Sequence, residues 1–265
     1  MNNLISIIIR IRRRIESYKY SRLHKKSHKK FLSFFDFFHH DDYFDYIKEF
    51  ILNTYFHDII NNQMVAAGIT KSLSSDPFGW YSVLYYLIRK IRPEIIVETG
   101  VWYGNSSAII LLALDNNKYG RLFSIDLPAQ HETGGYSYEF PCGSGIYRSA
   151  SLPQGRSPGF TVPDYLKNRW ELILGDSRIE LPKLFQKLQI VDMFLHDSLH
   201  SYENMMFEFT IAHKFLKQGG YILSDNINWN NAFTDFNKGL SLQACTYLAY
   251  NEEKTYKHNF GVIRV

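Results

Sequence analysis

The sequence predicts an α/β protein built on one doubly wound, mostly parallel sheet, preceded by a basic and aromatic N-terminal helical extension. Short apolar runs alternate with segments of helical periodicity over the last two thirds of the chain. This alternation is typical of a parallel sheet with helices on both faces. A length of 265 residues, 45% of them hydrophobic, is sufficient for one such domain and an appendage.

Two helices are expected before the first strand. Asp41 and Asp42 are candidate caps for a helix whose apolar residues recur at helical spacing from Tyr43 to Ile59. A second helix is expected over Gly79–Ile91.

Six short apolar runs predict strands. In chain order they are Glu94–Glu98, Arg121–Asp126, Leu172–Leu174, Ile190–Leu195, Gly220–Ser224 and Phe260–Val265. Helical segments are expected between them at Asn105–Leu114, Pro163–Asn168 and Ser201–Leu216. We therefore divide the chain into an N-terminal extension, residues 1–75, and a main domain, residues 76–265.

One connection in the main domain is unusually long. About forty residues separate Asp126 from Leu172, against roughly 2–6 for most loops of this kind. Residues 128–162 are rich in Gly and Pro, and a long loop at a sheet edge is usually a lid or a substrate loop. A disordered insertion is the alternative.

The formal charge of +4 is unevenly distributed. Residues 1–30 carry ten Lys and Arg and one acid, a balance of +9, so the remainder carries −5. This cluster could contact anionic lipid headgroups or nucleic acid, or it could be a solvated basic face.

The sequence lacks the signals of a membrane-spanning or disulfide-bonded protein. The apolar run Leu4–Ile9 is far shorter than the ~20 residues that span a bilayer and lacks the layout of a signal peptide. Cys142 and Cys245 stand apart with no CxxC pair, which fits a reducing compartment. We expect a cytoplasmic protein and leave open a peripheral membrane contact through residues 1–30.

A glycine turn follows the first expected strand, in the segment Glu98-Thr-Gly100-Val-Trp-Tyr-Gly104. Its G-x-x-x-G spacing differs from the G-x-G-x-x-G that a dinucleotide requires. Glu98 would suit a cationic ligand. Asp126, which ends the second strand, could accept two hydrogen bonds from ribose hydroxyls.

Polar side chains also follow the fourth and fifth expected strands. Because neighbouring parallel strands end about 5 Å apart, Asp197, Asp225 and Asn226 could converge on one hard cation such as Mg²⁺. His200 could take a proton from a substrate hydroxyl. The alternatives are that the aspartates only cap helices and that His200, like His196, is structural.

These motifs resemble those of a known family. ETGVWYGNSS followed by SID and by GDS resembles the motifs of class I S-adenosylmethionine-dependent methyltransferases. The resemblance implies a Rossmann-like, seven-stranded sheet over a methyltransferase domain. It also implies a set of S-adenosylmethionine-binding residues: Glu98, Gly100, Gly104, Ser106, Asp126, Asp176 and Ser177.

A second resemblance concerns the acceptor side. HDSLHSYE and LSDNINW look like segments of methyltransferase family 24, related to metal-dependent O-methyltransferases of the catechol and macrolide-sugar types. The resemblance covers roughly residues 75–265. It implies metal binding by Asp197, Asp225 and Asn226, with Mg²⁺ as the metal, and His200 as the base. The implied acceptor is a small hydroxylated molecule such as a sugar or glycosylated metabolite.

Other functions compete with this one. A non-catalytic protein of the same fold could dock on a membrane or an assembly through its basic N-terminus. An NAD-type oxidoreductase is disfavoured by the glycine spacing. Methylation of nucleobase amino groups usually uses an Asp/Asn-Pro-Pro-aromatic turn, here replaced by DSLH, so no nucleic acid partner is expected. A homo-oligomer remains open.

Overall fold

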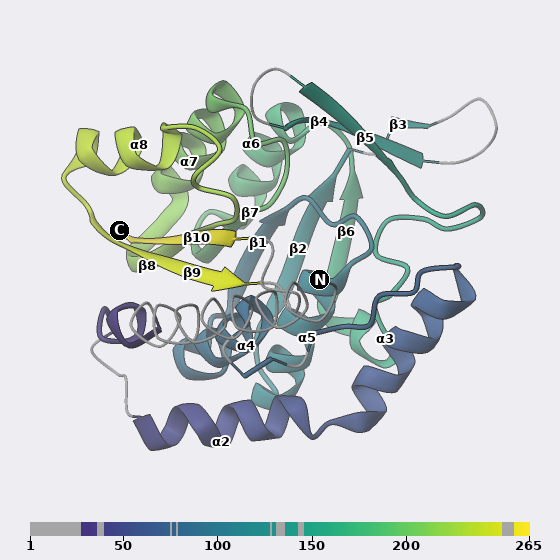
Figure 1. The fold of residues 1–265 in the computed structure, drawn as a ribbon. Helices are drawn as coiled ribbons and strands as arrows, with labels where there is room; N and C mark the ends of the chain where they lie inside the picture. The colour runs from purple at the N-terminus through teal and green to yellow at the C-terminus, as the bar shows by residue number, and fades with distance from the viewer. Residues whose placement is uncertain are drawn as a thin grey trace, which may run out of the picture.

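A computed structural model provides the fold (Figure 1). It describes residues 28–35, 40–74, 76–77, 79–127, 129–130, 136–142, 146–250 and 257–265. The basic segment 1–27 and its expected surface contacts lie outside the described residues.

The centre of the molecule is a seven-stranded sheet with the order β6-β2-β1-β7-β8-β10-β9. Its strands are β1 (Ile95–Thr99), β2 (Arg121–Asp126), β6 (Trp170–Leu174), β7 (Val191–His196), β8 (Leu216–Ser224), β9 (Gln243–Tyr250) and β10 (Lys257–Arg264). Pairing is parallel from β6 to β8, and β10 runs antiparallel to both of its neighbours. This confirms the predicted doubly wound, mostly parallel seven-stranded fold.

The chain order reverses at β1, which has β2 on one side and β7 on the other. In open α/β sheets, ligands bind beyond the carboxyl ends of the strands at such a switch point. The topology therefore locates the expected site at the ends of β1, β2, β7 and β8.

Helices cover both faces of the sheet (Figure 1). They are α2 (His40–Ile51), α3 (Thr54–Ala66), α4 (Trp80–Ile91), α5 (Asn105–Asn117), the 3₁₀ helix η1 (Asp164–Arg169), α6 (Ser177–Leu188), α7 (Tyr202–Phe215) and α8 (Ala232–Leu240). One apolar core lies between one face of the sheet and the helices α2, α3, α4 and α5. A second lies between the other face and the helices α6, α7 and α8.

The described part of the N-terminal extension is packed into the first of these cores. Phe31, Tyr43 and Phe50 are fully buried in the cluster that also contains residues of α4, α5 and the sheet. The hydroxyl of Tyr43 donates to the carbonyl of Pro77 at 2.6 Å, and Lys90 pairs with Asp42 at 2.7 Å. These contacts fix α2 against α4 and against the segment that precedes α4.

The single helix expected from Tyr43 to Ile59 is wrong, because two helices occupy this region. The first ends at Ile51, and the side chain of Asn53 accepts a hydrogen bond from the Phe56 N–H at 3.1 Å, which caps the second. Tyr55 is therefore turned outward and is 67% exposed. Asp41 and Asp42 lie inside the first turn of α2 rather than capping it.

The long connection after β2 contains a small sheet that the sequence did not indicate. It consists of β3 (Ala129–Gln130), β4 (Tyr136–Cys142) and β5 (Ile146–Ser151), paired antiparallel. Figure 1 shows it beyond the end of the main sheet toward which β2 and β6 point. The long segment is thus at the edge where ligands are expected.

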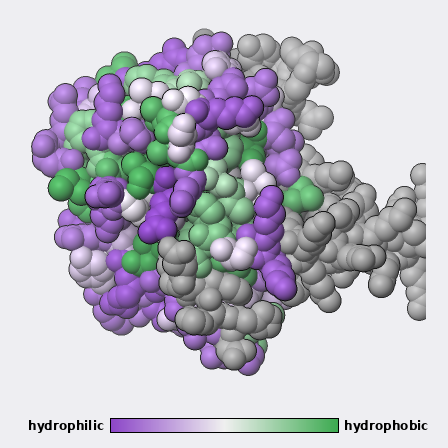
Figure 2. Space-filling model, turned by 90° about the vertical axis from the view of Figure 1, so that its left-hand side faces the viewer, coloured by the Kyte–Doolittle hydropathy of each residue, from purple (hydrophilic) through white to green (hydrophobic). Residues whose placement is uncertain are grey.

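The surface of the described residues is mixed in polarity. None of their helices is both long and apolar enough to cross a membrane. Figure 2 shows the face that lies at the left of Figure 1, where hydrophilic residues form most of the border and hydrophobic residues gather toward the middle.

Candidate active site

The glycine turn after β1 lies directly against the loop after β7. Gly100 has a φ of +85°, and a Cβ atom there would stand 2.0 Å from the backbone oxygen of Asp197. Only glycine meets both conditions, because the backbone is left-handed and the space is filled. The Asp197 N–H donates to the Thr99 carbonyl at 2.8 Å. The expected donor and acceptor sides therefore share a backbone contact.

Asp126 lies where the sequence analysis placed it, at the end of β2 beside the glycine turn. It is 5% exposed and accepts the backbone N–H of Trp102 at 3.0 Å. This contact ties the second strand to the turn that follows the first.

Glu98 lies below the turn rather than on its open side. The carboxylate is fully buried and accepts hydroxyl hydrogen bonds from three serines at 2.6–2.8 Å: Ser106, Ser107 and Ser124. Burial raises the pKa of Glu98, and these three hydrogen bonds act in the opposite direction. In this structure Glu98 holds the first turn of α5 to β1 and β2.

Gly104 contacts the end of the long connection. Its φ is +97°, and a Cβ there would stand 2.7 Å from the Cα of Gly159. The N–H groups of Gly159 and Thr161 donate to the carbonyls of Trp102 and Tyr103 at 2.8 and 3.0 Å. The glycine turn is thereby covered by residues 159–162.

Asp176 and Ser177 open α6 at the end of β6. The Asp176 side chain caps the helix by accepting the N–H of Arg178 at 2.8 Å. The Gly175 N–H donates to the Asp126 carbonyl at 2.9 Å, so this turn adjoins the end of β2. The structure thus brings the predicted S-adenosylmethionine-binding residues to three adjacent strand ends.

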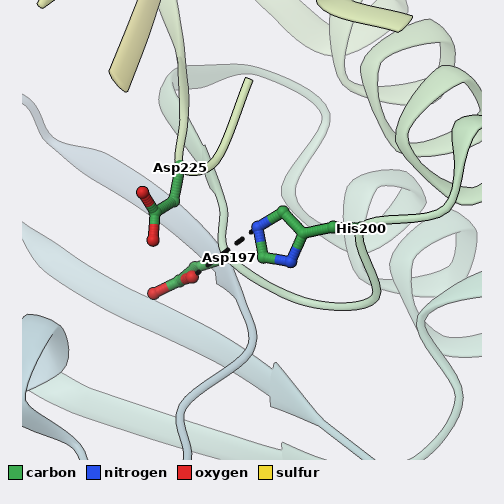
Figure 3. Close-up of side chains that lie close together, drawn as sticks. All are labelled: Asp197, His200 and Asp225. Carbon is green, nitrogen blue, oxygen red and sulfur yellow. Dashed lines mark ion pairs between the residues drawn. The ribbon is translucent and has the colours of Figure 1, made fainter. Parts of the chain in front are cut away.

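The predicted metal and base residues also converge. Asp197, His200 and Asp225 offer ligand atoms that all lie within 4.8 Å of one another. Figure 3 shows the imidazole of His200 pointing toward the two carboxylates, with Nε2 4.0 Å from Asp197 Oδ1. Burial and the negative charge of Asp225 raise the pKa of Asp197 well above its usual range.

Asn226 adjoins this cluster in a different way. Its backbone N–H donates to Asp225 Oδ1 at 2.7 Å, and its side-chain amide donates to Asp225 Oδ2 at 3.2 Å. Asn226 has a φ of +50°, a left-handed conformation that asparagine tolerates better than most residues. In this structure Asn226 supports Asp225, and its amide nitrogen faces the carboxylate.

Tyr81 is a residue of this site that the sequence analysis missed. It extends from α4, where its hydroxyl forms a hydrogen bond with the side chain of Asn105. Burial and then the charge of Asp197 raise its pKa. The run WYSVLYYLIRKI is apolar almost throughout, so its sequence offers no signal that separates Tyr81 from the core tyrosines.

Comparison with known proteins finds one family model that matches the chain. Residues 97–227 match a family model described as a methyltransferase domain, family 24. This segment runs from β1 through the turn after β8, and it contains both halves of the site. No curated protein sequence matches the chain.

Solved structures share the fold at low sequence identity. The O-methyltransferase TomG from Streptomyces achromogenes, involved in tomaymycin synthesis and solved with S-adenosylmethionine, superposes with a TM-score of 0.54. It is 16% identical over 79% of this chain and 89% of its own. An O-methyltransferase from Bacillus cereus, solved with S-adenosylhomocysteine, has a TM-score of 0.54 and 14% identity, covering 80% of this chain and 91% of its own.

The strand order and the family match define a class I S-adenosylmethionine-dependent methyltransferase. Within that class, residues 97–227 match the model of methyltransferase family 24.

Proposed function

We propose that this methyltransferase transfers a methyl group to an oxygen atom of a small hydroxylated acceptor, such as a sugar or a glycosylated metabolite. The observation that carries the proposal is the grouping of Asp197, His200 and Asp225 beside the glycine turn. The two superposed relatives are named O-methyltransferases, which supports oxygen as the methylated atom.

The proposed donor-binding residues lie at the ends of β1, β2 and β6 and in the turns that follow. They are Glu98, Gly100, Gly104, Ser106, Asp126, Asp176 and Ser177. Asp126 would accept hydrogen bonds from the ribose hydroxyls. Glu98 would act through the serines it holds, because its carboxylate is fully buried.

The acceptor side fits a hard divalent cation such as Mg²⁺. Asp197 and Asp225 place two carboxylates side by side, and burial followed by the charge of Asp225 raises the pKa of Asp197. Asp197, Asp225 and Asn226 would hold the ion. When bound, a divalent cation lowers the pKa of a coordinated hydroxyl and orients it.

His200 would accept the acceptor's proton at Nε2. The hydroxyl oxygen attacks the methyl carbon of the sulfonium, the sulfur–methyl bond breaks, and its electron pair remains on sulfur. The grouping of His200 with both aspartates also supports a second role for it, as a cation ligand through Nε2. The two roles predict different effects of the same substitution.

The experiment that tests this site compares Asp197→Asn and His200→Ala with the wild-type chain. In the wild-type chain, we expect EDTA to abolish the methylation of hydroxylated sugars. We expect Asp197→Asn to abolish the same activity and to weaken Mn²⁺ binding at least about tenfold. Binding of S-adenosylmethionine should change less than about threefold. Full activity of Asp197→Asn with and without EDTA would refute cation assistance.

His200→Ala then assigns the role of the histidine. If His200 is the base, its loss should lower kcat by roughly 10²–10⁴ and leave Mn²⁺ affinity intact. If His200 is a ligand, its loss should weaken Mn²⁺ affinity together with kcat. Wild-type kcat and Mn²⁺ affinity in this variant would contradict both roles.

We also propose a peripheral contact of residues 1–30 with an anionic surface. The support is the charge of +9 in that segment, against −5 in the rest of the chain. A protein that only docks, without catalysis, would show this contact and no binding of S-adenosylmethionine. A cytoplasmic location is compatible with this contact, and so is a homo-oligomer.

A further inference from the structure

We infer that Glu208 is the positioning residue that fixes the Asp197–His200 loop relative to the glycine turn. The inference rests on the proposed function in one respect, namely that Asp197 and His200 act on the acceptor side. Nothing in the sequence motifs assigns a role to Glu208.

Glu208 lies on α7 beneath the site and is fully buried. Its Oε2 accepts from Thr99 Oγ1 and from His196 Nδ1, each at 2.6 Å. Its Oε1 accepts from Ser198 Oγ at 2.8 Å and from Asn204 Nδ2 at 3.1 Å. One carboxylate therefore receives these four donors, and the side chain of Ser177 at the start of α6 also forms a hydrogen bond with it.

These donors come from the segments that carry the two halves of the site. Thr99 precedes Gly100 of the glycine turn. His196 and Ser198 flank Asp197, and Asn204 also donates to the carbonyl of Leu199 at 3.1 Å. Glu208 thus joins the end of β1 to the loop after β7 through side chains.

The charge of Glu208 matters as well as its shape. A buried carboxylate is costly unless it is fully hydrogen-bonded, and here the donors around Glu208 need an acceptor. A glutamine in its place would offer one amide nitrogen, which is a donor, toward either Thr99 and His196 or Ser198 and Asn204. Half of the ties would then be broken without a change in side-chain volume.

The loop after β7 should respond more strongly than the glycine turn. Thr99 stays paired within the sheet between β2 and β7. Ser198 lies in the loop, outside that pairing. Loss of the Glu208 acceptor should therefore displace Asp197 and His200 more than the glycine turn that follows Thr99.

The test compares Glu208→Gln with Glu203→Gln in the full chain. Glu203 lies on the same helix, is exposed, and undergoes the same chemical change. We measure Mn²⁺ affinity, S-adenosylmethionine affinity, and amide hydrogen exchange of residues 197–201 and 121–126. In Glu208→Gln we expect at least about tenfold weaker Mn²⁺ binding, donor affinity within about threefold, and faster exchange only in residues 197–201.

Other outcomes would overturn the inference. Unchanged Mn²⁺ affinity together with unchanged exchange of residues 197–201 would show that Glu208 does not hold the loop. Equal losses of Mn²⁺ and donor binding, with faster exchange in both segments, would show a general structural role. Ser198→Ala removes one hydrogen bond to Glu208 and one from Asn204, and it gives the same comparison if Glu208→Gln does not fold.

Failure of the cation proposal can be recognised separately. If the wild-type chain binds S-adenosylmethionine and no Mn²⁺, cation assistance is refuted. Hydrogen exchange then decides the role of Glu208, because it requires no ion. Faster exchange confined to residues 197–201 in Glu208→Gln supports the inference, and exchange equal to that of wild type refutes it.

Discussion

At the scale of single residues, the site depends on positions where only one residue type fits. Gly100 is the clearest case, since the backbone of Asp197 occupies the space where a side chain would begin. The same contact brings the glycine turn to the residue that we propose as a cation ligand. Stability and function therefore depend on the same atom-scale fit.

Gly100→Ala should be strongly destabilising. The backbone at this position is left-handed, and the new methyl group would collide with main-chain atoms of Asp197. We therefore expect the free energy of unfolding to fall by about 3 kcal/mol or more. Gly155→Ala is the matched control, because Gly155 has a φ of +72° and nothing within 4 Å of the added Cβ. It should lose only about 1 kcal/mol. Urea denaturation measures both, and equal losses would contradict the close contact at Gly100.

At the scale of elements, α7 connects the sheet to the loop after β7 through Glu208. Burial raises the pKa of this carboxyl. The adjacent His196 and the accepted hydrogen bonds lower it by more, so that the pKa is about 2. Because the folded pKa lies below the usual value of 4.5, ionised Glu208 stabilises the fold above about pH 4.5. That stabilisation is lost as the pH falls toward 2.

This difference predicts a pH-dependent effect of Glu208→Gln. The free energy of unfolding of wild type minus that of Glu208→Gln should be larger at pH 7 than near pH 2. The change in this difference should be on the order of 3 kcal/mol. Urea denaturation at a series of pH values measures it. Glu203→Gln should show no such pH dependence, and a constant difference between wild type and Glu208→Gln would contradict the low pKa.

The strands of the parallel part of the sheet could be predicted from the sequence because each is a short apolar run. The edge strand β9 could not, since its sequence QACTYLAY mixes polar and apolar residues. The break between α2 and α3 had a local signal in Asn53, but the apolar periodicity continues across it. There, helix capping prevailed over periodicity.

The site was predictable to the extent that it lies at strand ends. Asp126, Asp197 and Asp225 each follow an apolar run, and the topology brings such ends together. Glu208 was not predictable in this way, because its partner Thr99 lies 109 positions away. Its one local signal was an acid on the buried side of a helix, next to Phe209, where acids are rare unless paired.

At the scale of the whole molecule, charge separates the N-terminal segment from the rest of the chain. If that segment contacts anionic lipid, replacing Arg12, Arg13 and Arg14 by Glu should weaken binding to vesicles containing phosphatidylserine. At about 1 kcal/mol per basic residue, the loss is at least about a hundredfold. Co-sedimentation at low and high salt measures it.

A matched variant controls for total charge. Lys167, Lys183 and Lys187 are exposed and lie in the main domain, and their replacement by Glu makes the same charge change. This variant should keep most of its vesicle binding. Equal losses in both triple variants would contradict a specific contact by the N-terminal segment.

The account's central claim is that the glycine turn and Asp126 form an S-adenosylmethionine site. The most direct measurement is a calorimetric titration of the full chain with S-adenosylmethionine, beside the Asp126→Ala variant. We predict saturable binding at micromolar strength, weakened about tenfold or more by Asp126→Ala through the loss of hydrogen bonds to the ribose. Absence of saturable binding by the wild-type chain, with or without Mg²⁺, would contradict the claim.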